Sequence, residues 1–219
     1  MSILYQEMGD SYPPRTAFNA RSGDMTISFS VDFNSAGEKL TKKLVTQYHS
    51  EQHFCEIDMS VMSPLDAARK VYKYALTHNI KNLNIAGNGI YGFTSASNKW
   101  NQFEVNQYVY LVLRQILEGL KIKEYPFNIN KVFTGGQTGA DWAGAVAAVA
   151  LGIDCLVTFP NGYIQRMEDK KTIRNTQESL KIKMEKEINK IVLNMDINSA
   201  KQHFEEINKK NNIKNRFTI

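Results

Sequence analysis

A run of small residues in this sequence is suited to binding an anion. The run, Gly-Gly-Gln-Thr-Gly, follows the strand-like residues 131–134 and precedes an Ala-rich, helix-like segment over residues 140–151. A strand that passes through glycines into a helix leaves backbone N–H groups and the positive helix end facing outward, and no side chain keeps an anion away. The run therefore predicts a phosphate site made by Gly135, Gly136, Gln137, Thr138 and Gly139.

The motif differs from two widespread phosphate loops. No Gly-Lys-Ser/Thr follows it, as a Walker A loop requires, and its glycines are not spaced as in the Gly-x-Gly-x-x-Gly of dinucleotide folds. Asp141 falls in the first turn of the expected helix, where an acid complements the helix dipole. A role in binding a ligand hydroxyl or in organising the loop is an equal alternative for this residue.

Two other runs of small residues also follow strand-like segments. One opens a helix after residues 26–33 and the other follows residues 83–86. Each is a weak signal alone, and the second is more often structural. Their candidate binding residues are Ser35, Ala36, Gly37, Glu38 and Thr41 in the first run and Gly87, Asn88, Gly89 and Tyr91 in the second.

Strand-like and helix-like segments alternate along the chain. Expected strands cover residues 26–33, 53–58, 83–86, 131–134 and 153–159, and expected helices cover residues 37–48, 64–78, 103–120 and 140–151. The alternation predicts an α/β fold, a Rossmann-like doubly wound parallel sheet of about five strands with C-terminal helices. Such sheets bind ligands at the carboxyl ends of their strands, where all three runs of small residues fall.

The net charge of +5 is distributed unevenly. Residues 1–169 contain 15 Lys and Arg against 16 Asp and Glu, whereas residues 170–219 contain 12 against 6. We therefore expect a nearly neutral nucleotide-binding domain over residues 1–170 and a basic helical extension over residues 171–219. Lysines alternate with glutamates in the extension and aromatic residues are few, which argues against nucleic acid as a partner.

Other signals exclude several classes of protein. Cys55 and Cys155 lie in apolar runs, as buried structural cysteines do. No cluster has the spacing of a metal site, and no Ser/His or Cys/His pair predicts a covalent nucleophile. The first residues lack the pattern of a signal peptide, and no run approaches the length of a membrane span. We expect a cytoplasmic protein without a metal, a cofactor or a membrane partner.

The glycine run also carries a family resemblance. Residues 135–141, followed by Leu-Gly-Ile at 151–153, Pro-Asn-Gly at 160–162 and Glu-Asp at 168–169, resemble the first half of the molybdenum-cofactor carrier family. That family belongs to the SLOG group of Rossmann-like nucleotide-binding domains, together with DprA and the LOG phosphoribohydrolases. The family's second half is similar to residues 15–19, 24–26, 36–37 and 41, which come earlier in this chain. The order is therefore circularly permuted, an arrangement that resembles phage-encoded proteins.

The sequence departs from these families at two positions. LOG hydrolases carry a glutamate one turn into the helix that follows Pro-Gly-Gly-x-Gly-Thr, whereas Glu38 lies in the loop itself. Because a general acid must come within hydrogen-bond reach of the bond that it serves, this displacement argues against the hydrolase chemistry. The carrier family's Pro-Lys-Gly is Pro160-Asn161-Gly162 here, so a cation is missing.

The first functional interpretation is a binding protein that sequesters a phosphorylated, nucleotide-derived small molecule, such as an ADP-ribose-like compound or a cyclic nucleotide. Its phosphate would lie on the glycine-run amides, with a second anionic group near residues 35–38. Arg15, Asn19 and Asn88 would bond the ribose or phosphate, and Tyr91 or Phe159, next to Pro160, would stack on a base. In the phage setting that the resemblance implies, the ligand would be a messenger of host immunity.

The alternative is an enzyme. A nucleoside 5′-monophosphate phosphoribohydrolase, or a related hydrolase of an N-glycosidic bond, would use Glu38, Asp32 or Asp141 as acid and base. The sequence also favours a homo-oligomer. Apolar residues of the extension, including Ile182, Val192 and Phe204, need cover that either a second subunit or the chain's own domain would provide.

Overall fold

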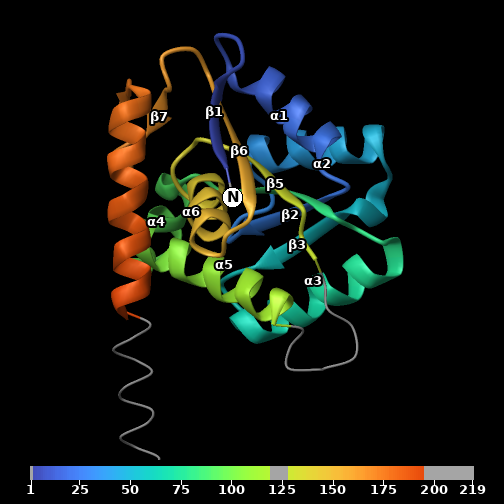
Figure 1. Cartoon of the computed structure of the whole chain (residues 1–219). Helices are drawn as coiled ribbons and strands as arrows, with labels where there is room; N and C mark the ends of the chain where they lie inside the picture. Colours follow the sequence, from blue (N-terminus) through green and yellow to red (C-terminus); the bar gives the residue numbers. More distant parts are fainter. Residues whose placement is uncertain (1, 119–127, 195–219) are drawn as a thin grey trace, which may run out of the picture.

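Six parallel strands form one sheet in the order β1-β6-β5-β4-β2-β3 (Figure 1). The computed structural model describes residues 2–118 and 128–194. The strands are β1 (Ile3–Glu7), β2 (Met25–Ser30), β3 (Phe54–Asp58), β4 (Asn82–Gly87), β5 (Lys131–Gly135) and β6 (Asp154–Phe159). This sheet confirms the predicted Rossmann-like α/β fold, and all five expected strands are present.

Helices cover both faces of the sheet. Helices α1 and α2 lie together on one face, and α3, α5 and α6 lie on the other (Figure 1). The bounds are α1 (Tyr12–Ser22), α2 (Ala36–Tyr48), α3 (Pro64–His78), α4 (Ile90–Ala96), α5 (Gln102–Leu117) and α6 (Ala140–Ala150). From β2 the chain moves outward to β3 and then returns to β4 on the other side of β2. The order in which successive strands are added to the sheet therefore reverses between β2 and β4. Ligands bind at such a switch point in doubly wound folds.

Local sequence signals explain why the helices begin and pack as they do. The Ser63 hydroxyl accepts the Asp66 N–H and Pro64 follows directly, as expected from the Ser-Pro-x-Asp start of α3. In α6, a Cβ built at Gly144 would lie 2.6 Å from Ile85. The Ala- and Gly-rich composition thus lets α6 approach the sheet more closely than larger side chains allow.

Several short elements are absent from the sequence expectation. Strand β1 occupies the sheet edge and Leu4 in it is exposed, so it lacks the apolar run of a buried strand. Helix α1 begins with two prolines and has few apolar residues, and α4 contains Gly, Thr and Ser. A two-stranded hairpin of β7 (Gln165–Arg166) and β8 (Thr172–Ile173) follows the main sheet. These elements are stabilised by tertiary contacts more than by local propensity.

The described part of the basic extension contains β8 and a helix over residues 177–194, which contacts α5 through Glu187 and α6 through Lys183 (Figure 1). Leu180, Met184 and Ile191 are buried in the main hydrophobic core, so this helix folds back on its own chain. Ile182 and Val192 remain exposed. The division at residue 170 and the homo-oligomer stay predictions, and Phe204 lies outside the described residues.

Candidate functional site

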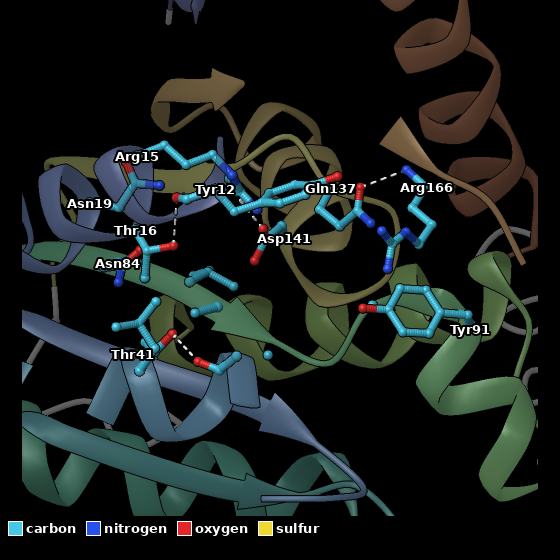
Figure 2. A pocket seen from close by; sticks show the side chains of 17 residues that line it. Tyr12, Arg15, Thr16, Asn19, Thr41, Asn84, Tyr91, Gln137, Asp141 and Arg166 are labelled. Atoms are coloured by element: carbon cyan, nitrogen blue, oxygen red, sulfur yellow. Dashed lines mark hydrogen bonds and ion pairs between the residues drawn. The ribbon is translucent and has the colours of Figure 1, made fainter. Parts of the chain in front are cut away.

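A cavity of about 240 Å³ opens at the carboxyl ends of β4 and β5, between α1 and α2 (Figure 2). The cavity lies at the edge of the sheet where the fold predicts a ligand, next to the switch point between β2 and β4. Its polar lining comes from α1, α2, β4, α4, the glycine loop (residues 135–139), α6 and β7. The lining residues are Tyr12, Arg15, Thr16, Asn19, Gly37, Leu40, Thr41, Asn84, Ile85, Ala86, Gly87, Gly89, Tyr91, Gly135, Gln137, Asp141 and Arg166.

Arg15 is the buried cation of this cavity. Its residue is 6% exposed, its Nη1 donates to Asp141 Oδ2 at 2.9 Å, and its guanidinium lies 4.9 Å from the centroid of the Tyr12 ring. Among the described residues no group accepts a hydrogen bond from its Nε. Burial raises the pKa of the Asp141 carboxyl, and the Arg15 charge opposes that rise. The ion pair thus leaves the Nε of a cavity-lining side chain buried and without an acceptor among the described residues.

Asn19 lies one helical turn after Arg15 and lines the same cavity. Its Nδ2 donates to Thr158 Oγ1 at 2.8 Å, whereas its Oδ1 is buried and has no donor among the residues that the structure describes. Figure 2 shows the two side chains together at one end of the site. Because α1 presents residues four apart on one face, the two side chains that carry an unpaired buried donor and an unpaired buried acceptor share the side of α1 that lines the cavity.

Amides of the predicted phosphate loop already donate hydrogen bonds to acceptors within the protein. The Gly136 N–H donates to Thr158 O at 2.7 Å, the Gly139 N–H donates to Gln102 Oε1 at 2.7 Å, and the Gln137 N–H bonds to the Asp141 carboxylate. A Cβ built at Gly135 would lie 1.6 Å from Arg15 Nη1. Glycine at this position therefore makes room for the ion pair, and the Asp141 carboxylate takes the place expected for a ligand phosphate.

The same loop holds strand β7 and its arginine. The Thr138 hydroxyl donates to Arg166 O, and the Arg166 N–H donates to Gln137 Oε1 at 2.8 Å. The Gln165 amide donates to Gly136 O at 2.5 Å. The guanidinium of Arg166 then lies 5.6 Å from the centroid of the Tyr91 ring, and both side chains line the cavity (Figure 2). The glycine loop thus holds Arg166 at the cavity, and the sequence interpretation did not include this cation.

A second cavity of about 490 Å³ adjoins the first and shares Gly37, Gly87, Gly89 and Tyr91 with it. Its lining includes the acidic residues Asp32 and Glu38 and, among the described residues, no Lys or Arg. Its other lining residues are Ser35, Ala36, Asn88, Gly92, Ser95 and Ala96. The two cavities therefore differ in charge.

Glu38 lies in the first turn of α2, so the expectation that it lies in the loop is wrong; the helix begins at Ala36 because the Ser35 side chain accepts the Glu38 N–H. Its side chain is buried at the second cavity. It is 3% exposed, and the Ser28 hydroxyl of β2 donates to its Oε2 at 2.5 Å. Burial raises the pKa of its carboxyl to about 7, and hydrogen bonds from Ser28 and Ser30 oppose the rise. A carboxyl with this pKa is present in both protonation states near neutrality, as a general acid or base requires.

The side-chain amide of Asn88 is hydrogen-bonded to the protein backbone. Its Oδ1 accepts the N–H groups of Val31 and Asp32, both at 2.9 Å, and its Nδ2 donates to Asp32 O at 2.9 Å. These bonds attach the end of β2 to the end of β4. The amide therefore shapes the second cavity with its polar atoms already engaged.

Most of the predicted residues converge on the two cavities, but five do not line either of them: Gly136, Thr138, Gly139, Phe159 and Pro160. Phe159 is fully buried and its ring contacts those of Tyr5 and Tyr163. A Cβ at Gly136 would lie 1.9 Å from that ring. Phe159 is therefore a core residue whose ring is not available to stack on a base in this structure.

Four polar lining residues were not singled out from the sequence: Tyr12, Thr16, Asn84 and Arg166. Tyr12 and Thr16 share the cavity face of α1 with Arg15 and Asn19, a spacing that becomes informative once this segment is known to be helical. Asn84 is a polar residue inside an apolar strand, where it is 2% exposed and donates to Thr26 Oγ1. Arg166 carries no local signal because its place is fixed by contacts 29 residues away in the sequence.

The family model of the circularly permutated YpsA SLOG family matches residues 4–101. These residues include α1, β2 and α2, the elements in which the sequence is similar to the second half of the carrier family. The match confirms the resemblance to the SLOG superfamily in permuted order. This superfamily suggests a nucleotide-related ligand-binding or LOG-like function, with a small molecule as the partner. No curated protein and no solved structure matches the chain.

Two features are absent from residues 2–118 and 128–194. There, no group of three or more His, Cys, Asp or Glu side chains is arranged to hold a metal ion. No helix in these ranges is both long and apolar enough to cross a membrane.

Proposed function

We propose that the protein binds a phosphorylated nucleoside compound across the two cavities and holds it uncleaved. The observation that carries this proposal is the pair of unused polar atoms on α1, Arg15 Nε and Asn19 Oδ1. A buried donor or acceptor left unpaired costs about 1–3 kcal/mol, so such groups in a cavity favour a ligand that satisfies them. A phosphate oxygen would accept from Arg15, and a hydroxyl or amino group would donate to Asn19.

The charges of the two cavities support one orientation of the ligand. The first cavity contains Arg15 and Arg166, which suit phosphate groups. The second contains Asp32 and Glu38, whose oxygens suit ribose hydroxyls or a base amino group and disfavour a second anion. Tyr91 borders both cavities and offers a ring for stacking. This orientation revises the sequence expectation of an anionic group near residues 35–38.

The finer proposal concerns the ligand and its fate. A compound with phosphates at one end and an uncharged nucleoside at the other, such as an ADP-ribose-like molecule or a cyclic nucleotide, matches this polarity. Sequestration of such a compound as a messenger of host immunity follows from the resemblance to phage-encoded proteins.

Mass spectrometry of released ligands tests the proposal. The purified protein is incubated with ADP-ribose, cyclic nucleotides or AMP, separated from free ligand and then heated to release what is bound. Recovery of an intact nucleotide from the wild type, and much less from Arg15→Met with Asp141→Asn, supports binding through the first cavity. If none of these compounds is retained, the proposed binding is wrong, and recovery of cleavage products alone contradicts sequestration.

A second candidate, hydrolysis of an N-glycosidic bond, is favoured by Glu38. Its carboxyl lies beneath the cavity assigned to the nucleoside, and burial raises its pKa to about 7. A protonated Glu38 would donate its proton to the departing base as the N-glycosidic bond breaks and water attacks the ribose carbon, and the resulting carboxylate would then accept a proton from that water. Release of free adenine from AMP by the wild type, lost in Glu38→Gln, would establish the enzyme, and retention of intact AMP over hours would exclude it for this substrate.

A further inference from the structure

The helix over residues 177–194 approaches the glycine loop through charged side chains as well as through its apolar face. Lys183 and Glu187 are four residues apart and share the inward side of the helix with Leu180 and Met184, which are buried. The Lys183 ammonium lies 4.9 Å from the centroid of the Trp142 ring, and Trp142 is fully buried in α6. Two charged side chains thus occupy the inward side of this helix, where apolar residues would have a smaller desolvation cost.

Lys183 is connected to one end of the glycine loop. Its Nζ donates to Gln165 Oε1 at 2.7 Å, and the Gln165 Nε2 donates to Gly136 O at 2.5 Å. Gln165 is fully buried, so its amide has exchanged water for these two partners. The Lys183 side chain is partly buried, and this burial lowers the pKa of its ammonium to about 8.

Glu187 is connected to the other end of the loop. The Asn106 Nδ2 donates to Glu187 Oε2 at 3.1 Å, and the Gln102 Nε2 donates to Asn106 Oδ1 at 2.8 Å. The Gly139 N–H donates to Gln102 Oε1 at 2.7 Å. Asn106 is fully buried on α5. One turn of the outer helix is therefore linked to Gly136 through the buried amide of Gln165, and to Gly139 through the buried amide of Asn106 and the partly buried amide of Gln102.

The residues between these two glycines serve the cavity. Gln137 lines it, and the side chains of Gln137 and Thr138 hold the backbone of Arg166. Buried polar networks whose members are all paired make a structure rigid, whereas glycines leave a backbone with more freedom than other residues. The loop therefore depends on contacts from outside for a fixed shape.

We propose that Lys183 and Glu187 are positioning residues for the ligand site. They fix the two ends of the glycine loop through Gln165 and through Asn106 and Gln102, and the loop in turn fixes Gln137 and Arg166. Binding is a linked equilibrium, so a ligand that contacts Gln137 or Arg166 must stabilise the docking of the helix by the same free energy as the docked helix contributes to ligand affinity. This second statement rests on the proposed function.

Hydrogen–deuterium exchange without ligand tests the positioning. Lys183→Met and Glu187→Met should each speed exchange over residues 135–139 and 165–166 at least fivefold. The matched controls Lys186→Met and Glu185→Met change exposed residues of the same helix and should leave exchange there at the wild-type rate. Gln165→Leu combined with Lys183→Met should add little to either change alone, because both interrupt one chain of contacts.

Two results would overturn the positioning role. One is unchanged exchange over residues 135–139 in both inward variants. The other is faster exchange over the whole chain together with a lowered melting temperature, because lost packing of the helix alone produces that pattern.

Experiments with ADP-ribose as the probe test the linkage between helix docking and ligand binding. Each inward variant should bind ADP-ribose at least fivefold more weakly than its matched control, and ADP-ribose should slow exchange over residues 177–194 of the wild type. Equal affinities, or a helix whose exchange does not respond, would overturn the linkage. If neither ADP-ribose nor another nucleotide binds the wild type, the proposed function fails, whereas the ligand-free exchange still decides the positioning role.

Discussion

Arg15 serves both the fold and the proposed site, and the two roles are separable. Its guanidinium neutralises the buried Asp141 carboxylate at 2.9 Å, while its Nε is buried without an acceptor among the described residues. A buried ion pair that loses one partner leaves an uncompensated charge, which costs more than the pair itself contributes. Removal of both charges avoids that penalty.

We therefore expect Arg15→Met to lower the free energy of unfolding by about 3–5 kcal/mol. Adding Asp141→Asn should recover most of that loss, because no charge is then left unpaired, yet it should not recover nucleotide binding. Urea denaturation measures the first effect and calorimetric titration with ADP-ribose the second. Full binding by the double variant would show that Arg15 has a structural role only.

Glu38 should make stability depend on pH. Burial raises its pKa from 4.5 to about 7 in the folded protein, so the folded state holds the proton more tightly than the unfolded state does. The stabilisation from the protonated carboxyl is present below pH 4.5 and is lost as the pH rises through 7.

Glu38→Gln removes this titration. The difference in unfolding free energy, variant minus wild type, should therefore increase by up to about 3 kcal/mol from pH 5 to pH 8. Urea denaturation at several pH values measures the difference, with the exposed Glu178→Gln as control. Parallel curves for Glu38→Gln and the wild type would contradict the raised pKa.

At the scale of elements, the glycine loop joins β5 to α6 and depends on close packing. The sequence pattern predicted open amides, but the strand, the helix and β7 approach so closely that the amides of Gly136 and Gly139 donate to protein acceptors. The glycines are needed for the approach of Phe159, Arg15 and Asp141 to the backbone. A substitution in this loop should therefore disturb the fold before it disturbs a ligand.

Gly136→Ala should cost about 1–3 kcal/mol of unfolding free energy, because its Cβ would overlap the buried Phe159 ring. Gly37→Ala is the matched control, since a Cβ there meets no atom within 4 Å and the position lies in the first turn of α2. It should leave stability unchanged or raise it by up to about 1 kcal/mol. Thermal denaturation of both variants compares them, and equal melting temperatures would contradict the packing role.

At the scale of the whole molecule, exposed apolar residues support the predicted homo-oligomer. Leu4 lies on the edge strand β1, and Val192 and Leu193 lie on the outer helix, where they are exposed in a single chain. Sheet edges and exposed apolar residues are common sites of self-association. The sequence already predicted a helical extension whose apolar residues need cover, whereas the position of β1 at the edge of the sheet is known only from the structure.

Light scattering during size-exclusion chromatography should give a mass of at least twice that of one chain. Leu4→Lys or Val192→Lys should lower that mass if the corresponding element makes the contact, because a charge disfavours burial. Lys186→Met, an exposed change of opposite character on the same helix, serves as the comparison. A monomeric wild type at the concentrations used for binding would contradict the prediction.

The sequence by itself determined the alternation of strands and helices, the Rossmann-like class and the edge of the sheet that holds the site. These follow from local patterns, since apolar periodicity and glycine runs at strand ends act over a few residues. Arg15, Asn19, Glu38 and Tyr91 were also found this way, through the family resemblance and their positions beside glycine runs. Edge strand β1 and helix α1 were missed because their local patterns are weak.

The tertiary structure alone decided what the glycine loop does. Whether an amide meets a ligand or a protein acceptor depends on residues distant in sequence, such as Thr158 and Gln102 for the loop and Arg166 for the cavity. Likewise, the pKa of Glu38 depends on its burial against β2. Local sequence carries propensity, but burial and long-range hydrogen bonding arise only when the sheet and its helices come together.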